Sequence, residues 1–183
     1  MKPLFLDLET NGTDKNRHDL WHLAAIIPGP FNPTNADAEI SLKSRPYNVP
    51  ASDPVALDIG GITQTELKAL PDPHTTISEF TGLLCKCLED PDDRFTLIGY
   101  NILGFDKDFL FNWFKRNGYF FGSYFSYYVI DVYAFIQALH QTGVFPGLPK
   151  LKLEVVCEYL GIPIQAHNPI SDIRATRPLP EIR

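Results

Sequence analysis

Two carboxylates stand one residue apart at the end of an apolar segment near the start of the chain. Asp7 and Glu9 close the stretch PLFLDLE, residues 3–9, which is rich in large apolar residues. We expect this stretch to be a buried strand, and alternate residues of a strand point to the same face of a sheet. Two like charges that close are unfavourable unless a positive charge lies between them. The pair therefore indicates a bound metal ion.

Two further carboxylates follow where α/β domains often place functional groups. Asp106 comes just after the apolar segment FTLIGYN, residues 95–101, and Asp172 lies in the first turns of an expected helix. Asn168 and Pro169 are suitable residues to open that helix. Helix starts favour anions, and strand ends of α/β sheets gather ligand-binding residues. All four acids could therefore meet at one site.

Oxygen ligands contributed by several elements suit Mg²⁺ or Mn²⁺ better than zinc. Two such ions about 3.5–4 Å apart stabilise the attacking and leaving oxygens in phosphodiester cleavage. His167, five residues before Asp172, could take the proton of an attacking water. Taken singly, each acid has an ordinary interpretation as a solvated residue, and His167 as a loop histidine. Together, like charges beside a core favour the metal site.

The composition is that of an acidic globular protein, with 183 residues, 44% of them hydrophobic, and a net charge of −6. This charge argues against a grip on nucleic acid by electrostatics alone, but it permits an enzyme that meets phosphates through divalent cations. We see no membrane-length apolar run and no signal peptide. The three cysteines lack zinc-site spacing and fit buried or half-buried thiols. We expect a cytoplasmic protein without a membrane partner.

The order of elements predicts a single domain of the α/β or α+β class over residues 1–183. An antiparallel meander is expected from the apolar segments 3–9, 21–27 and 38–44. Later segments predict alternating strands and helices: strands at 95–101 and 128–130, helices at 75–90, 106–118, 131–143, 150–161 and 169–176. Thr63 and Glu66 have capping-box spacing. Pro178 and Pro180 are expected to cut the last helix off after about residue 177.

The chain resembles the DEDDh group of 3′–5′ exonucleases in three places: Asp7-x-Glu9-Thr10, Asp106 after GYNILGF, and His167 separated from Asp172 by four residues. In the tyrosine subgroup a Tyr would stand four residues before the last acid, where this chain has Asn. The resemblance implies a ribonuclease-H-like fold, a three-layer α/β/α arrangement with a mixed central sheet. The blocks GGITQTEL, LIGYNILGFDKDFLFNWFKRNGY, DVYAF and LKLEVVCEYLGI are most similar, in the same order, to the nuclease domain of exodeoxyribonuclease I.

The resemblance also implies roles for individual residues. Asp7, Glu9 and Asp172 would hold the ion that activates water, Asp7 being shared by both ions. Asp106 would act through the second ion or its waters, and His167 would be the general base. Four more residues would bind substrate, lining the pocket of the terminal nucleotide or positioning the strand: Thr10, Ile62, Asn101 and Phe105.

The expected function is therefore metal-dependent release of nucleoside 5′-monophosphates from the 3′ ends of single-stranded nucleic acid, with DNA favoured over RNA. An exoribonuclease acting on short RNA is one alternative. The other is a degenerate nuclease that binds nucleic-acid ends or serves as a subunit of a repair or replication assembly. Two departures from the family support this second alternative: Asn168-Pro169 replaces the usual Asp-Ala, and the last helix is short. Relatives carry further domains, so further domains or a partner protein could supply the grip on the strand.

Overall fold

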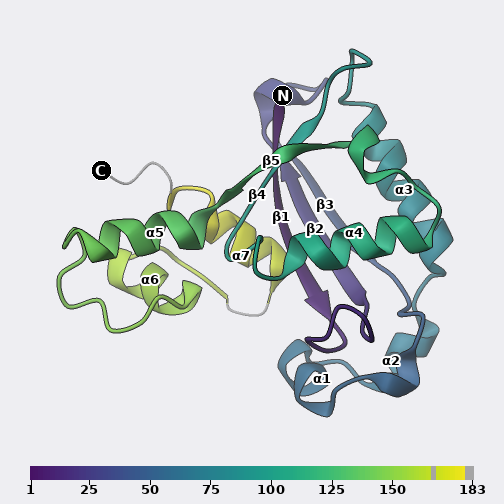
Figure 1. The fold of residues 1–183 in the computed structure, drawn as a ribbon, viewed down its shortest axis with the longest axis horizontal. Helices are drawn as coiled ribbons and strands as arrows, with labels where there is room; N and C mark the ends of the chain where they lie inside the picture. Colours follow the sequence, from purple (N-terminus) through teal and green to yellow (C-terminus); the bar gives the residue numbers. More distant parts are fainter. Residues whose placement is uncertain (166–167, 180–183) are drawn as a thin grey trace.

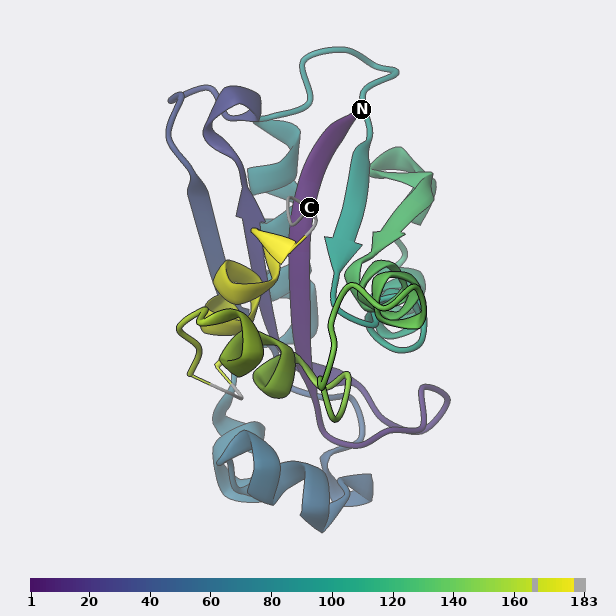
Figure 2. The same cartoon turned by 90° about the vertical axis from the view of Figure 1, so that its left-hand side faces the viewer.

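The computed structural model describes residues 1–165 and 168–179. Within these residues the chain forms a five-stranded sheet with helices on both faces (Figures 1 and 2). The strands are β1 (Lys2–Thr10), β2 (Leu20–Ile27), β3 (Ala38–Lys43), β4 (Phe95–Gly99) and β5 (Phe125–Asp131). The helices are α1 (Pro54–Gly60), α2 (Gln64–Ala69), α3 (Pro73–Cys85), α4 (Asp106–Arg116), α5 (Val132–Gln141), α6 (Leu153–Leu160) and α7 (Pro169–Thr176). Short 3₁₀ turns are η1 (Gly29–Phe31), η2 (Val49–Ala51) and η3 (Phe121–Ser123).

The strand order is β3-β2-β1-β4-β5. The first three strands form the predicted antiparallel meander, while β4 and β5 run parallel to β1. The sheet is therefore mixed, and the helices on its two faces confirm the predicted three-layer α/β/α architecture. None of the helices in the described ranges is long and apolar enough to cross a bilayer.

The alternation of β1 separates the two layers of the core. Leu4, Leu6 and Leu8 are buried in the cluster that α3 and α4 complete. Phe5 points to the opposite face and packs in the cluster formed with α5, α6 and α7. Figure 2 shows α7 in front of the sheet and α3 behind it. Asp7 follows the direction of Phe5 and therefore faces the layer that contains α7.

A small third cluster supports α1 and α2 at one end of the sheet, with Trp21 and Leu67 at its centre. The predicted capping box at the start of α2 is confirmed. The Thr63 hydroxyl accepts a hydrogen bond from the Glu66 N–H, and the Glu66 carboxylate accepts one of 2.8 Å from the Thr63 N–H. The two exchanged bonds satisfy main-chain donors that a helix start leaves unpaired.

The largest differences from the sequence-based expectation occur at element ends. α3 ends at Cys85, five residues before the predicted end at residue 90, because the chain leaves the helix through a turn in which the Cys87 N–H bonds the Leu84 carbonyl. β5 begins at Phe125, three residues before the expected strand, and α6 begins at Leu153 rather than at residue 150. Cys87 and Cys157 are buried thiols as expected, but Cys85 is exposed, so its predicted burial is wrong. α3 ends at this residue, and the side chain lies on the solvent side of the last turn.

Candidate active site

The end of β1 presents Asp7 and Glu9 to the α7 side of the sheet. Across the antiparallel ladder Asp7 pairs with Ala24 and Glu9 with His22, and both acids are half-buried. The ladder shifts register between Glu9 and Thr10. Such an irregularity bends a strand and re-aims its last side chains, a common feature beside active sites.

Asp106 is fixed against the main chain of β1. Its carboxylate, at the first residue of α4, accepts a buried hydrogen bond of 3.0 Å from the Leu8 N–H. β1 pairs with β4 only as far as Phe5 and Ile98. Beyond that point the two strands separate, and the Leu8 N–H has a carboxylate as its acceptor. Because Leu8 lies between Asp7 and Glu9, Asp106 is held beside both.

Asp131 shapes the loop that leads to Asp106. Its carboxylate accepts hydrogen bonds from the N–H groups of Asn101 at 3.0 Å and Leu103 at 3.1 Å. The same side chain caps α5 by accepting from the Tyr133 N–H at 3.0 Å. The sequence placed Asp131 at a helix start, but nothing in its local pattern indicated the contacts with the loop.

Asp172 approaches from the other layer, in the first turn of α7. The Asn168 side chain caps this helix by accepting a hydrogen bond of 3.2 Å from the Ser171 N–H, and Pro169 occupies a first-turn position as predicted. α7 packs over the carboxylates of β1, and the negative charge of Asp172 acts on both Asp7 and Glu9.

The acids share a strongly unfavourable environment for negative charge. Burial, with the charges of Asp106, Asp172 and Glu9, holds the pKa of Asp7 well above its usual range. Burial and the charge of Asp172 raise the pKa of Glu9 to about 7. Burial also raises the pKa of Asp106 to about 7, although the hydrogen bond from Leu8 opposes the rise. Like charges gathered in a desolvated place are typical of functional sites.

The donor chemistry of this cluster fits a hard divalent cation. Carboxylate oxygens are the ligands that Mg²⁺ and Mn²⁺ prefer, and a bound cation would relieve the repulsion that raises these pKa values. Among the described side chains, however, no three His, Cys, Asp or Glu residues converge closely enough to form a finished metal cage. The structure thus brings the acids into one electrostatic cluster, and their role as metal ligands remains a proposal.

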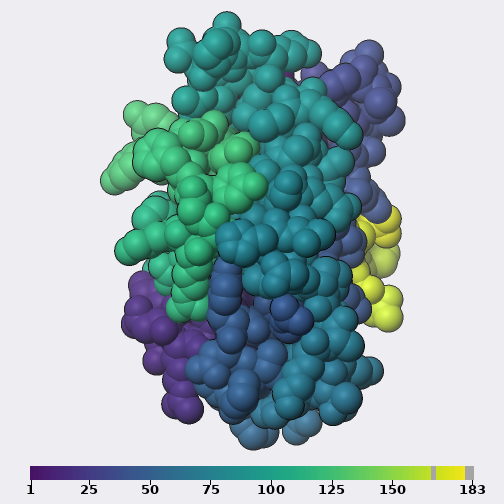
Figure 3. Space-filling model, turned by 90° about the vertical axis from the view of Figure 1, so that its right-hand side faces the viewer, coloured from purple at the N-terminus to yellow at the C-terminus, as the bar shows by residue number. Residues whose placement is uncertain are grey.

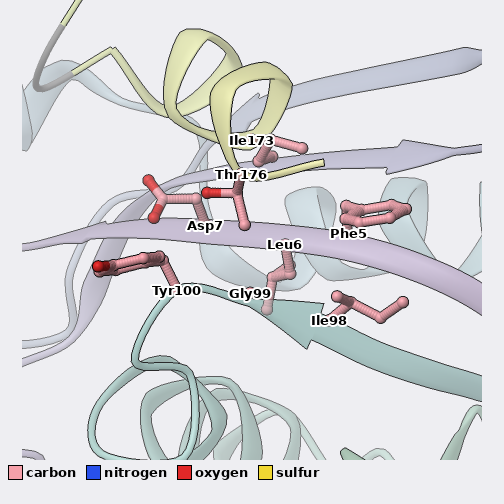
Figure 4. A pocket seen from close by; sticks show the side chains of 8 residues that line it. All are labelled: Phe5, Leu6, Asp7, Ile98, Gly99, Tyr100, Ile173 and Thr176. Carbon is pink, nitrogen blue, oxygen red and sulfur yellow. The ribbon is translucent and has the colours of Figure 1, made fainter. Parts of the chain in front are cut away.

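Two residues beside Asp7 were missed by the sequence reasoning. A narrow hollow at Asp7 is bordered by Tyr100 and Thr176 (Figure 4). The Tyr100 hydroxyl is fixed by donating a 2.6 Å hydrogen bond to the Leu151 carbonyl. Figure 4 shows the Thr176 hydroxyl on the side of the hollow where Asp7 lies. A signal for Thr176 did exist, because it stands four residues after Asp172 and shares its helix face.

Two of the proposed substrate-binding residues are adjacent in sequence to the acids. Thr10 is buried at the end of β1, and its hydroxyl donates a 2.8 Å hydrogen bond to the Gly12 carbonyl. Phe105, immediately before Asp106, is half-buried, with its ring centroid 4.7 Å from that of Phe109. Both positions also have a packing role.

The other two proposed substrate-binding residues occupy different surroundings. Asn101 is exposed at the start of the loop before α4 and has a positive φ of 60°. Ile62 is half-buried and packs against the third cluster, beside α2. His167 lies outside the described residues. The substrate-binding roles of all four residues, and the catalytic role of His167, stay predictions.

The sequence as a whole matches one family model. The model is that of the RNase_T exonucleases, and it matches residues 4–177. The chain belongs to this exonuclease family. No curated protein sequence matches the chain. The exonuclease predicted from the sequence is thereby confirmed at the level of the family.

Solved structures share the fold over almost the whole chain. A structure of exonuclease I has 26% identity, a TM-score of 0.77, and covers 94% of this chain. The zinc-bound form of the E. coli exonuclease I complex with single-stranded DNA has 25% identity, a TM-score of 0.76 and 96% coverage. E. coli exonuclease I with a dT13 oligonucleotide has 24% identity, a TM-score of 0.75 and 94% coverage. The match covers 38%, 39% and 39% of those chains, so this chain spans about two fifths of their length.

Proposed function

We propose that the chain is a metal-dependent 3′–5′ exonuclease that hydrolyses single-stranded DNA and releases nucleoside 5′-monophosphates. The observation that carries the proposal is the cluster of carboxylates at the end of β1, where neighbouring charges and burial raise the pKa of Asp7, Glu9 and Asp106. Membership in the exonuclease family and the fold shared with DNA-bound exonuclease I support this class of reaction.

In the proposed reaction a water molecule attacks the phosphorus of the last phosphodiester. The bond between phosphorus and the 3′ oxygen of the preceding sugar breaks, so the terminal nucleotide leaves with a 5′ phosphate. Asp7, Glu9 and Asp172 would hold one Mg²⁺ or Mn²⁺ ion, and Asp106 would act on a second ion or its waters. Two bound ions supply positive charge where the attacking and leaving oxygens become negative.

The proton of the attacking water would pass to His167, as the family resemblance implies. This residue immediately precedes Asn168 and Pro169, which open α7 and thereby carry Asp172 to the site. A His167→Ala variant should lose most of its activity while keeping its affinity for Mn²⁺, which would separate proton transfer from metal binding.

The proposed preference for DNA rests on the resemblance to exodeoxyribonuclease I. Digestion of 5′-labelled DNA and RNA of one sequence, with Mg²⁺, Mn²⁺ or EDTA at low salt, tests it. A metal-dependent ladder that shortens from the 3′ end, faster on DNA, is the expected result. Faster shortening of RNA would make the chain an exoribonuclease, because the sugar 2′-OH is what distinguishes the two polymers.

A degenerate module that binds nucleic-acid ends is the second candidate. The lack of a finished metal cage among the described acids favours it. This candidate predicts oligonucleotide binding without hydrolysis and little thermal stabilisation by Mn²⁺, whereas an enzyme should be stabilised. In either case further domains or a partner protein would supply the grip on the strand, and we expect the chain alone to release its substrate after few cuts.

A further inference from the structure

The edge strand β5 contains two more residues than its neighbour across one stretch of the ladder. Phe95 of β4 pairs with Phe125, but Leu97, only two residues later, pairs with Val129. The extra residues form a bulge, which is closed by a 3.0 Å hydrogen bond from the Ser126 hydroxyl to the Tyr128 carbonyl. The strand therefore bends outward around residues 126–128.

The bulge leaves two tyrosine rings in solvent. The side chains of Tyr127 and Tyr128 are 89% and 67% exposed, although Phe125 at the start of the same strand is buried. Their ring centroids lie 6.1 Å apart with an interplanar angle of 80°. A regular strand could have turned one of these rings into the core. Exposed aromatic surface of this kind marks an interaction site.

Tyr127 of this pair approaches the first turn of α4, the helix that begins with Asp106. The Lys107 ammonium is 5.7 Å from the centroid of the Tyr127 ring, and Lys107 directly follows Asp106 in α4. Figure 3 shows the green residues of η3 and β5 projecting from the surface beside α4. An aromatic surface and a cation thus lie beside the first turn of α4.

The combination fits one kind of occupant better than others. Bases of a single strand have free faces that stack on aromatic rings, and their phosphates attract a neighbouring lysine. With a net charge of −6 the chain has little general attraction for a polyanion, so contacts that do not depend on charge must contribute much of the affinity. The bulge provides such contacts near the start of α4.

We propose that Tyr127 and Tyr128 form a stacking platform for bases of the single strand that lie upstream of the nucleotide being removed, with Lys107 beside the backbone. The inference rests on the proposed function and extends it to the path of the strand. Stacking does not distinguish between bases, so the platform should accept any sequence. It should not accept paired ends, because their bases are already stacked in a duplex.

The test compares a Tyr127→Leu/Tyr128→Leu double variant, which loses the rings, with Tyr127→Phe/Tyr128→Phe, which keeps them. KM and kcat are measured with Mn²⁺ on oligothymidylates from two to twelve nucleotides long. At about 1–3 kcal/mol for each stacked base, the Leu variant should raise KM for the longer substrates about fivefold or more. The kcat of the Leu variant and its KM for the dinucleotide should stay near the wild-type values. The Phe variant should have wild-type kcat and KM at every length. The matched control is Phe31→Leu, which removes a partly exposed aromatic ring elsewhere on the surface. Phe31 lies in η1, just after β2.

Equal KM values for the Leu variant and wild type at every length would overturn the platform while leaving the exonuclease intact. A change of oligomeric state in the Leu variant, with KM unchanged, would identify an interface between copies of the chain instead. If the wild type hydrolyses nothing, the proposed function fails. Fluorescence anisotropy with a labelled dT12 then tests the platform separately, and wild-type binding in the Leu variant would contradict it. Thermal melting confirms folding, and both exposed rings should be replaceable without loss of Tm.

Discussion

The main-chain N–H of Leu8 donates a 3.0 Å hydrogen bond to the carboxylate of Asp106, across 98 positions of sequence. This bond ties the start of α4 to β1, between the two acids that the strand presents. One carboxylate therefore serves the fold as an acceptor for a buried donor and the proposed site as a negative charge. Substitutions can separate these two contributions.

Asp106→Asn should strongly lower kcat without unfolding the protein. An amide oxygen can still accept from the Leu8 N–H, whereas the charge that a cation needs is gone. We expect kcat to fall by about a hundredfold or more, with the Tm of the metal-free protein unchanged or higher. Asp106→Ala should in addition destabilise the fold by about 1–3 kcal/mol, because the Leu8 N–H loses its buried acceptor. Urea unfolding and a single-turnover assay measure the two effects, and equal stability of both variants would contradict this role for the bond.

Glu9→Gln should stabilise the metal-free protein at neutral pH. The pKa of Glu9 is raised to about 7 in the folded state from an ordinary 4.5, so between these values the unfolded state ionises first. The stability of the folded protein therefore falls as the pH rises from 4.5 to about 7, and the penalty is complete above that range. At pH 8 the free energy of unfolding of the variant should exceed that of wild type by about 1–3 kcal/mol, and at pH 4.5 by little. Each kcal/mol corresponds to roughly 2–4 °C in Tm.

Calorimetry at the two pH values, in the presence of EDTA, measures this difference. Glu79→Gln, which removes an exposed acid on α3, serves as the control. Saturating Mn²⁺ should reverse the order, because only wild type keeps the full charge for the ion. A gain from Glu9→Gln that is the same at both pH values would show that charge repulsion is not its cause.

Metal affinity should rise steeply with pH between 6 and 8. Protons compete with the cation at Glu9 and Asp106, whose pKa values are both raised to about 7. Each proton displaced on binding should change the Mn²⁺ affinity by about tenfold per pH unit at pH values below these pKa values. Titration calorimetry in two buffers of different ionisation enthalpy counts the released protons. Affinity that is constant over this range would place the ion elsewhere.

The turn after Glu9 should tolerate no side chain at Gly12. A Cβ there would lie 2.3 Å from Nδ1 of His18, whose ring accepts a 3.0 Å hydrogen bond from the Asp14 N–H. We expect Gly12→Ala to cost about 1–3 kcal/mol and to lower activity by shifting the end of β1. Gly82→Ala in α3, where a Cβ meets nothing within 4 Å, should instead stabilise by about 0.5–1 kcal/mol. Denaturant unfolding distinguishes them, and a neutral Gly12→Ala would show that the turn can relax.

Local patterns were sufficient to predict most of the strands and helices and the acids of the site, whereas the three-layer arrangement was implied by the resemblance to the exonuclease family. Alternation along β1 placed Asp7 and Glu9 on one face, and helix-start chemistry indicated Asp106 and Asp172. Contacts between distant segments left no such pattern. The bond from Leu8 to Asp106 depends on where β1 and β4 separate, which is a property of the assembled sheet.

The bulge in β5 is a second feature that periodicity could not predict. Two extra residues interrupt the alternation, so the sequence indicated a strand only at 128–130, whereas β5 starts at Phe125. The hydrogen bonds that Asp131 accepts from the loop before α4 could not be predicted from the sequence for a similar reason. A helix cap is recognisable from its own neighbours, but its further hydrogen bonds to Asn101 and Leu103 require the parallel arrangement of β4 and β5.

The most direct test of the account is the rate of Mn²⁺-dependent hydrolysis of 5′-labelled single-stranded DNA by wild type, Asp7→Asn and Asp92→Asn. Asp92 is an exposed acid in the loop before β4, remote from the carboxylate cluster. We predict a ladder that shortens from the 3′ end for wild type and Asp92→Asn, abolished by EDTA, and no ladder for Asp7→Asn. Full activity of Asp7→Asn, or hydrolysis that persists in EDTA, would contradict a metal-dependent exonuclease built on these carboxylates.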